Sequence, residues 1–468
     1  MNSNRLRYLR VFFIFFFLFA LSTKFWVSSW NDASRMAAIQ AIVEQGSFII
    51  DNSIFETGDK YLFNHHFYSD KPPILALYAS PVYLVLKELG VSFESYPKLA
   101  HYLITIFSIG SLSALGLVVF RMILTQFFHV NNEWADLTTL VTGIGTLILA
   151  YSSVFNNHIA SGSLLLIGFY FLLNFGKNGR IENVVYSGLM FSLAGSIDTN
   201  CFLFIPFALF LFFRRSVKAG LVFVISGLPI ITLYLLLNLF TSGSFLPPPL
   251  NASLWNYPGS DFDQANLSGL ATHKDISDLV VYAFHMILGN RGLISHSPIL
   301  IFSFVGLVVL YKNNQSFEYK TEYAVLFFAS LLYIGIYILR TVNYSGHAFG
   351  VRWFASLMLI LCLPITSIES WVRSSRIKYG IFVVVACLSI LIAIIGIYNP
   401  FIPSSDISAG QAHLVENTIF VSINLFVTES TFFGKVRILL VSFVAFFLFL
   451  SALGKSSPSS LTKRACTD

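Results

Sequence analysis

Long apolar stretches recur along the chain, each close to the roughly 20 residues that a helix needs to cross the core of a bilayer. Only 11% of the 468 residues are charged, whereas soluble domains carry about 25%. Backbone N–H and C=O groups cannot stay unpaired in lipid, so such stretches form helices. The sequence therefore predicts an all-α polytopic membrane protein.

About twelve membrane-spanning helices are predicted by length and hydropathy. The first follows three arginines, like a signal peptide, but no cleavage site follows it and we expect it to be retained. Residues 1–455 are predicted to form one transmembrane domain, followed by a short tail at 456–468. The predicted spans lie near residues 11–28, 100–123, 137–154, 158–176, 183–197, 200–213, 219–241, 295–311, 321–342, 353–370, 379–398 and 436–453.

Lys and Arg gather in alternate links between these spans, for example at Arg214 and Lys218. Because cytoplasmic links carry an excess of these residues, we place both termini in the cytoplasm, with the protein in a bacterial cytoplasmic (inner) membrane. The other links face outward, and the three long ones lie near residues 29–99, 242–294 and 399–435. This topology explains the net charge of +6, so no nucleic-acid partner is predicted.

The first long outward loop is predicted to contain two interfacial juxtamembrane helices. Apolar residues at 33–45 recur with a period of about 3.6, with Asp32 as a candidate N-cap and Gly46 as a stop. The second helix is expected to start at Pro72, because proline suits the first helical position.

Asp32 has two interpretations. An N-cap needs only one side-chain oxygen, and that role alone explains an aspartate at this position. In the other interpretation, partial desolvation at the membrane surface tunes the carboxylate for proton removal, as a general base. The two roles are compatible, since a helix N-terminus also stabilises a carboxylate.

Lys71 lies in the most distinctive string of this loop, Tyr68-Ser69-Asp70-Lys71-Pro72-Pro73. A lysine beside free backbone N–H groups at a helix N-terminus is well suited to bind phosphate. The alternative is a snorkelling lysine that pairs with Asp70. The Pro-Pro pair favours a phosphate site, because it fixes the backbone where a simple anchor needs no rigidity.

Three other polar positions are candidates for substrate contacts. His158 follows Asn156, and the pair also suits a plain N-cap with an interfacial histidine beside it. Asp198 lies between two short apolar runs. An acid at or within the membrane is costly, which indicates a function, but Asp198 could instead be a hairpin-turn residue at the membrane interface. Arg352 faces outward against the charge bias, which either a phosphate contact or snorkelling explains.

No cofactor or metal site is predicted. The four cysteines form no Cys-x-x-Cys pattern, and the histidines lack the spacing of metal ligands on one helix. The sequence also has no glycine-rich phosphate loop, which disfavours a nucleotide substrate.

At these motifs the chain resembles the C-type membrane glycosyltransferases, which use polyprenyl-phosphate sugar donors. Within them it is most similar to the protein O-mannosyltransferase and lipid A aminoarabinose transferase groups. Asp32-Ala33-Ser34-Arg35 is similar to the acidic motif of their first outer loop. The residues from Tyr68 to Pro73 match their Tyr-x-(Glu/Asp)-Lys-Pro-Pro string. Many members carry a second acid after the aspartate, where this chain has Ala33.

This resemblance implies an enzyme that transfers a sugar, with inversion and without a metal, at the outer (periplasmic or lumenal) membrane face. The donor would be a polyprenyl-phosphate sugar, and the acceptor a hydroxyl of a glycan, lipid or protein. Asp32 would be the catalytic base, and Lys71 and Arg352 would hold the donor phosphate. We also predict that Arg35, Tyr68, Asp70, His158 and Asp198 contact the substrates. A secondary transporter and a lipid-linked polysaccharide ligase or polymerase remain as alternatives.

Overall fold

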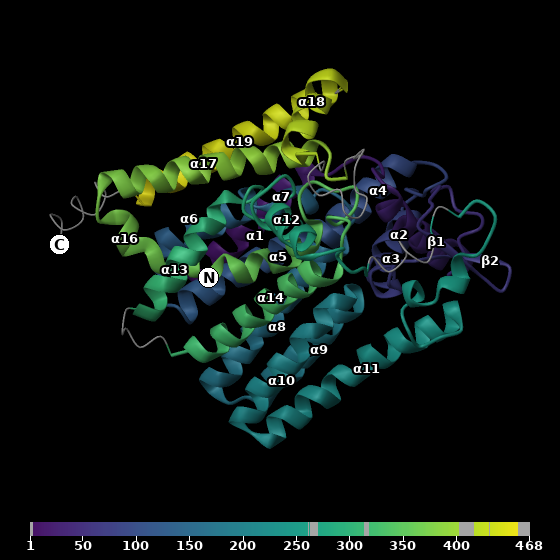
Figure 1. Cartoon of the computed structure of the whole chain (residues 1–468), viewed down its shortest axis with the longest axis horizontal. Coiled ribbons are helices and arrows are strands. Elements are labelled where there is room, and N and C mark those ends of the chain that lie inside the picture. The colour runs from purple at the N-terminus through teal and green to yellow at the C-terminus, as the bar shows by residue number, and fades with distance from the viewer. Residues whose placement is uncertain are drawn as a thin grey trace.

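The computed structural model describes residues 3–260, 262, 270–312, 318–401, 416–429 and 431–456. Over these residues the chain is an assembly of helices around one large apolar core, with a short two-stranded hairpin at one end (Figure 1). The predicted helical membrane class is confirmed. Most of the predicted tail at 456–468 and part of the loop at 399–435 lie outside the described residues.

The structure does not confirm the predicted number of spans. Within the described residues, six helices are long and apolar enough to cross a membrane, and a seventh is added if a pair bent by 41° counts as one span. That pair is Arg352–Leu361 with Leu363–Arg373. The six are Pro97–Gln126, Asn157–Asn178, Val217–Ser242, Lys320–Arg340, Arg376–Tyr398 and Phe432–Lys455.

Several predicted spans are interrupted, because helix-breaking residues fall inside apolar stretches. The stretch at 137–154 divides into α6 (Asn132–Ile144) and α7 (Leu147–Tyr151). Thr146 leaves the helix at this point, and its hydroxyl accepts a hydrogen bond from the Ile148 N–H. The stretch at 353–370 divides into η7 (Arg352–Leu357), α15 (Met358–Leu361) and η8 (Leu363–Ile368) around Pro364, which has no N–H to donate.

The other helical segments include predicted spans and also helices within the predicted loops, such as Ile276–Ile287 and Thr418–Glu429. Those of the first half are α1 (Ser3–Ser22), α2 (Trp30–Gln40), η1 (Ala41–Gln45), α3 (Pro73–Glu88), α4 (Pro97–Thr105), η2 (Ile106–Gly110), α5 (Ser111–Gln126), α8 (Asn157–Asn178), α9 (Ile181–Ile197), η3 (Thr199–Leu203), α10 (Phe204–Arg215) and α11 (Val217–Ser242). Those of the second half are η4 (Pro248–Leu250), η5 (Ala252–Trp255), α12 (Ile276–Ile287), η6 (Pro298–Leu300), α13 (Ile301–Lys312), α14 (Lys320–Arg340), α16 (Glu369–Arg373), α17 (Arg376–Tyr398), α18 (Thr418–Glu429) and α19 (Phe432–Ser456).

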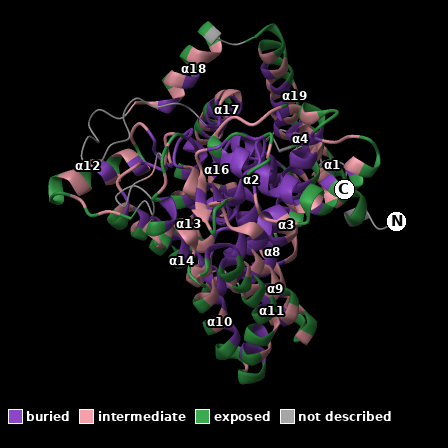
Figure 2. Ribbon diagram, turned by 90° about the vertical axis from the view of Figure 1, so that its right-hand side faces the viewer, coloured by how far each residue is buried: buried purple, intermediate pink, exposed green. Residues whose placement is uncertain are grey.

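Burial separates central helices from those that face lipid. In α8, 72% of an apolar 18-residue segment is buried, and this helix packs against α5 and α9. In α11 and α19 the buried share falls to 22% and 28%. Figure 2 shows the buried residues in the middle of the assembly and exposed ones at its outer helices. Broad exposed apolar surfaces on long helices are those expected to contact hydrocarbon.

The first outer loop differs in detail from its prediction. Its first helix begins at Trp30, before the predicted 33–45, and continues from Gln40 as a π-helical turn to Gln45. Gly46, at φ +61°, ends it as predicted. The second helix starts at Pro73, one residue later than predicted.

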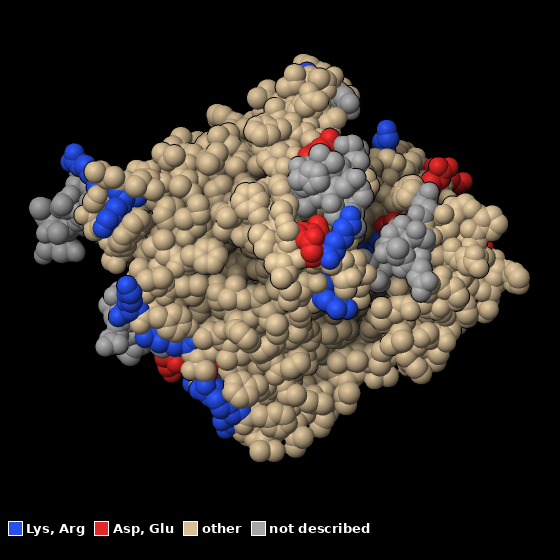
Figure 3. All heavy atoms as spheres, in the orientation of Figure 1, with Lys and Arg blue, Asp and Glu red and all other residues tan. Residues whose placement is uncertain are grey.

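A hairpin that the sequence did not predict lies between these two helices. It pairs β1 (Lys60–Phe63) with β2 (His66–Ser69) in antiparallel register. The two turn residues, Asn64 and His65, have φ values of 48° and 66°, as a tight two-residue hairpin requires. Figure 3 shows Lys and Arg side chains along the left and lower-left edge of the molecule, and others near its centre and at the upper right. The outward orientation of the loop remains a prediction.

Candidate functional site

The N-terminus of α2 is closed by a capping box, which corrects the predicted role of Asp32. Ser29 is the N-cap, and its hydroxyl accepts hydrogen bonds from the N–H groups of Asn31 and Asp32. Asp32 lies at the N3 position. Its Oδ1 accepts from the Ser29 N–H at 2.8 Å, and its Oδ2 from the Ser28 N–H at 2.9 Å. The N-cap is therefore Ser29 and not Asp32, and the Asp32 side chain contributes to the cap by accepting a hydrogen bond from the Ser29 N–H.

The environment of Asp32 constrains any proton transfer. The side chain is 0% exposed, and both oxygens are held by backbone N–H and hydroxyl donors. Burial raises the pKa of the carboxyl, and the hydrogen bonds from Ser28 and Ser29 oppose that rise. To reach an acceptor hydroxyl, one oxygen would have to leave the capping box. The predicted role of Asp32 as the base stays a prediction.

Lys71 is held by two carboxylates. Its Nζ lies 2.6 Å from Oδ2 of Asp59 and 2.9 Å from Oδ2 of Asp70. The pairing with Asp70 that the sequence offered as an alternative is thus present, and Asp59 adds a second acid. Burial raises the pKa of Asp70, and the Lys71 charge opposes this. Lys71 is therefore a neutralised cation in this state.

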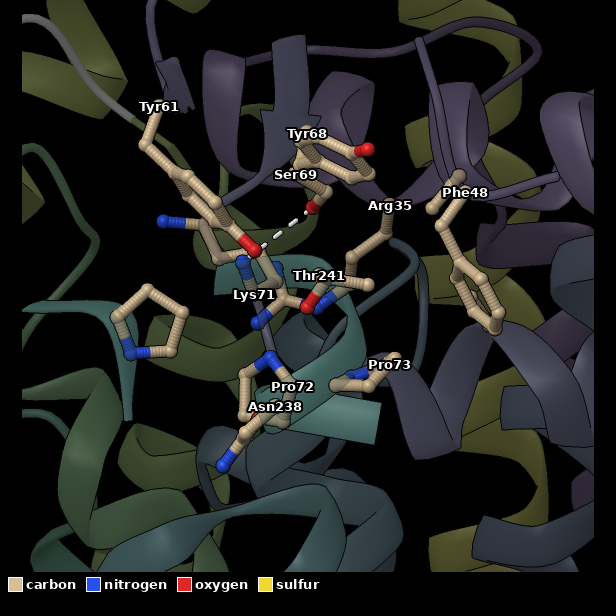
Figure 4. Close-up of a pocket in the computed structure, with 13 residues that line it drawn as sticks. Arg35, Phe48, Tyr61, Tyr68, Ser69, Lys71, Pro72, Pro73, Asn238 and Thr241 are labelled. Carbon is tan, nitrogen blue, oxygen red and sulfur yellow. Dashed lines mark hydrogen bonds between the residues drawn. The ribbon is translucent and has the colours of Figure 1, made fainter. Parts of the chain in front are cut away.

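A narrow cavity joins Lys71 to Arg35. Tyr61 and Tyr68 from the hairpin form part of its wall, and Thr241 contributes from α11. Figure 4 shows the Arg35 and Lys71 side chains entering this space from α2 and from the link between β2 and α3. The cavity measures about 20 Å³, which is room for about one water molecule. A phosphate could enter only if these side chains moved apart.

Arg35 links α2 to the start of α8. It is 3% exposed, and its Nη2 donates to Oδ1 of Asn157 at 2.7 Å. Its Nη1 donates to the backbone oxygen of Asn31 at 2.6 Å. Burial lowers the pKa of this guanidinium to about 10, while the charge of Asp70 acts in the opposite direction. Among the described residues Arg35 forms no ion pair with a carboxylate, so its charge remains available to an anion.

His158 and Asp198 form a buried pair beside Arg35. Nδ1 of His158, in the first turn of α8, lies 2.6 Å from Oδ2 of Asp198, which ends α9. The Asn156 side chain accepts from the His158 N–H at 2.8 Å, so the predicted N-cap is confirmed. Asp198 is 2% exposed and lies at the turn between α9 and η3, so both its functional role and its role as a turn residue stay predictions.

Arg352 lies at the start of η7, next to these groups but outside the cavity. Gly162 of α8 lets η7 approach closely, since a Cβ at that position would be 2.5 Å from the Ser356 carbonyl oxygen. Arg352 is close enough for its charge to act on both Arg35 and His158. Its buried Nε has no hydrogen-bond partner in the described part of the chain.

The predicted site residues therefore form one group, although they do not share one cavity. Arg35, Tyr68 and Lys71 line the cavity, whereas Asp32 and Arg352 do not. The remaining members are placed around it: Asp70 contacts Lys71, and His158 and Asp198 adjoin Arg35 through Asn157.

Sequence reasoning missed Asp59 and the role of Arg291. No helix or motif signal marks Asp59, which becomes visible only when the hairpin folds back onto Lys71. Arg291 is 0% exposed, and its Nη1 donates to the Ala348 carbonyl at 2.7 Å, which helps to hold the loop before Arg352. An arginine in a predicted outward loop was the available signal for it.

Comparison with known proteins identifies the fold. No protein-family model and no curated protein sequence matches the chain. Among solved structures, ArnT from Cupriavidus metallidurans bound to undecaprenyl phosphate superposes with a TM-score of 0.51, over 96% of this chain and 77% of ArnT. The chain shares the overall fold of this ArnT.

The chain also superposes on ArnT in its apo state, with a TM-score of 0.52 over 96% of this chain and 76% of ArnT. The archaeal oligosaccharyltransferase AglB from Archaeoglobus fulgidus was solved in complex with an inhibitory peptide and a dolichol-phosphate. It superposes with a TM-score of 0.47 over 93% of this chain and 59% of AglB. Sequence identity is 11% in all three cases, so the likeness concerns the fold alone.

Proposed function

We propose that this protein is a membrane glycosyltransferase that takes a sugar from a polyprenyl-phosphate donor. The observation that carries the proposal is the fold shared with ArnT over 96% of the chain, since that ArnT structure contains undecaprenyl phosphate. The Lys71-Pro72-Pro73 link supports it, because it places a cation at the N-terminus of α3, a helix with an exposed apolar side.

The donor phosphate would replace the carboxylates around Lys71. Asp59 and Asp70 hold this lysine, and a phosphate entering from the lipid side would compete with them for Nζ. Arg35 would contribute from the opposite wall of the cavity, and Arg352 from η7. These cations would also stabilise the negative charge that grows on the leaving phosphate during transfer.

The acceptor would be a hydroxyl of a glycan, lipid or protein. Its oxygen would displace the phosphate from the anomeric carbon in a single step, which inverts the configuration. Because Lys71, Arg35 and Arg352 supply the electrostatic stabilisation, we expect transfer to persist in EDTA. We also propose that the reaction takes place at the outer face, which the alternation of basic links in the sequence supports.

A secondary transporter fits these observations less well. Transporters place their ionisable residues near the membrane midplane, at the interface of repeated halves. Here the polar group is built from the first outer loop and from helix ends: His158 begins α8, Asp198 ends α9 and Arg352 begins η7.

The test uses the purified protein in proteoliposomes that contain radiolabelled polyprenyl-phosphate sugars and candidate acceptors. We expect label to move to an acceptor, with a much lower rate for Lys71→Ala. Accumulation of a free solute inside the vesicles, with no transfer from any donor, would instead establish a transporter.

A further inference from the structure

A histidine and an aspartate form a buried dyad in which one ring nitrogen is left open. His158 Nδ1 is 2.6 Å from Asp198 Oδ2, and their side chains are 8% and 3% exposed. Beside a carboxylate, Nδ1 carries the proton and donates it, which leaves Nε2 with an unshared electron pair. Nε2 makes no hydrogen bond among the described residues, and it is not fully buried.

The dyad adjoins the cations assigned to the donor. Asn157, the residue before His158, accepts a hydrogen bond from Arg35, which lines the cavity with Lys71. The charged groups that act on the imidazole are Asp198, Arg352 and Arg35. An acceptor hydroxyl near Nε2 would therefore lie close to the leaving phosphate.

The fold itself brings the two residues together. The short link between α8 and α9 makes these helices antiparallel neighbours, so the start of one meets the end of the other. Asp198 caps α9 and is held there by the fold, so it can fix both the tautomer and the orientation of the imidazole.

We propose that His158, positioned by Asp198, accepts the proton of the acceptor hydroxyl. The inference rests on the proposed glycosyl transfer. The acceptor O–H bond breaks as its proton moves to Nε2, and the oxygen forms a bond to the anomeric carbon. The bond from that carbon to the phosphate oxygen breaks, and polyprenyl phosphate leaves with the electron pair. The imidazolium, stabilised by Asp198, then releases its proton to water.

The dyad differs from Asp32 in access to substrate. Both oxygens of Asp32 are engaged by Ser28 and Ser29, and the side chain is 0% exposed. Nε2 of His158 needs no rearrangement of a helix terminus to receive a proton. The two candidates therefore give different results when each is replaced.

The first experiment measures transfer by His158→Gln and Asp198→Asn in proteoliposomes. A general base contributes about 10²- to 10⁴-fold, so we expect kcat to fall by that factor, with a smaller change in KM for the donor. The acid limb of the pH profile should disappear in His158→Gln. Asp198→Asn should also lower kcat, because an amide can donate to Nδ1 and favour the wrong tautomer, and Asp198→Glu should restore part of the rate.

A second experiment is independent of activity. Diethyl pyrocarbonate acylates accessible neutral imidazole nitrogens, and mass spectrometry locates the product. We expect modification of His158 in the unaltered protein and protection of His158 by polyprenyl phosphate. The matched control is His66, which forms the same kind of pair with Asp51 at 2.7 Å but on the exposed hairpin. His66→Gln should transfer at the normal rate, and His66 should be modified with or without the lipid.

The outcomes separate the two proposals. Normal kcat and an unchanged pH profile in His158→Gln overturn the dyad and leave glycosyl transfer intact. An unreactive His158 beside a reactive His66 also overturns it, because Nε2 is then inaccessible. Absence of transfer by the unaltered protein overturns the proposed function, and the role of the dyad with it.

Discussion

Nζ of Lys71 lies 2.6 Å from Oδ2 of Asp59, so the lysine of the Lys-Pro-Pro string is balanced by an acid from a different part of the loop. The two residues are expected to have opposite effects on donor binding. Lys71→Ala should weaken it by about 2–5 kcal/mol, because a charge contact is lost and two carboxylates remain unpaired. Asp59→Asn should strengthen it, since the phosphate then has one competitor fewer. Both effects are measured as KM for the donor.

The control for Lys71 is Lys60→Ala. Lys60 lies on the same hairpin, with its Nζ 4.5 Å from the centre of the Phe67 ring, and this change should leave KM nearly unaltered. Equal losses in both lysine variants would indicate a general charge effect and would contradict a phosphate contact at Lys71.

Ser29 and Asp32 are predicted to stabilise α2 together. Ser29→Ala removes the cap and should lower the free energy of unfolding by about 0.5–2 kcal/mol, seen as a lower Tm in detergent. Transfer per folded molecule then separates the two roles of Asp32. Loss of transfer in Asp32→Asn alone would support a base, whereas similar small losses in both variants would support capping only.

Asp32 should also give stability a specific dependence on pH. Burial raises the pKa of Asp32 in the folded state. At pH values between the ordinary aspartate pKa and this raised pKa, the unfolded chain therefore binds fewer protons than the folded chain. Stability therefore falls as the pH rises through this interval. In Asp32→Asn, the decrease of Tm with pH over this interval should disappear. An unchanged dependence of Tm on pH would contradict a raised pKa of Asp32.

Arg35 is predicted to be sensitive to the shape of its side chain as well as to its charge. Its guanidinium reaches Asn157 with one nitrogen and Asn31 with another. Arg35→Lys keeps the charge but cannot make both contacts, so we expect weaker donor binding by roughly tenfold or more. Full activity of Arg35→Lys would mean that only the charge matters at this position.

Gly162 is predicted to be essential to the contact between α8 and η7. Gly162→Ala places a methyl group against the Ser356 backbone, which cannot move aside like a flexible side chain, so we expect a loss of about 1–3 kcal/mol. Gly335→Ala in α14 is the matched control, because nothing lies within 4 Å of its added Cβ. That variant should be neutral or more stable, by up to about 1 kcal/mol. Thermal unfolding of both proteins tests the contrast.

The sequence correctly predicted the membrane class and the stop at Gly46, because each depends on local composition or a local motif. The predicted number of spans is not confirmed. Hydropathy does not register that Thr146 and Pro364 break helices inside apolar stretches. An apolar segment that is buried among other helices also needs no full crossing length.

Of the pairings in the site, the sequence offered that of Lys71 with Asp70 but not that of His158 with Asp198. His158 and Asp198 were each marked as candidates, yet they are 40 positions apart, and only the antiparallel packing of α8 on α9 brings them into contact. The short link between those helices could have indicated it. Asp59 could not have been found, because a hairpin without a sequence signal carries it to Lys71.

The small space around Lys71 has a consequence for how ligands reach the protein. A soluble anion that arrives from water must displace two carboxylates to reach Nζ of Lys71. A donor dissolved in the bilayer is tethered beside the entrance, so its head group is present at a high effective concentration. With the proposed donor, the site would therefore favour a phosphate delivered through the lipid phase over free phosphate in water.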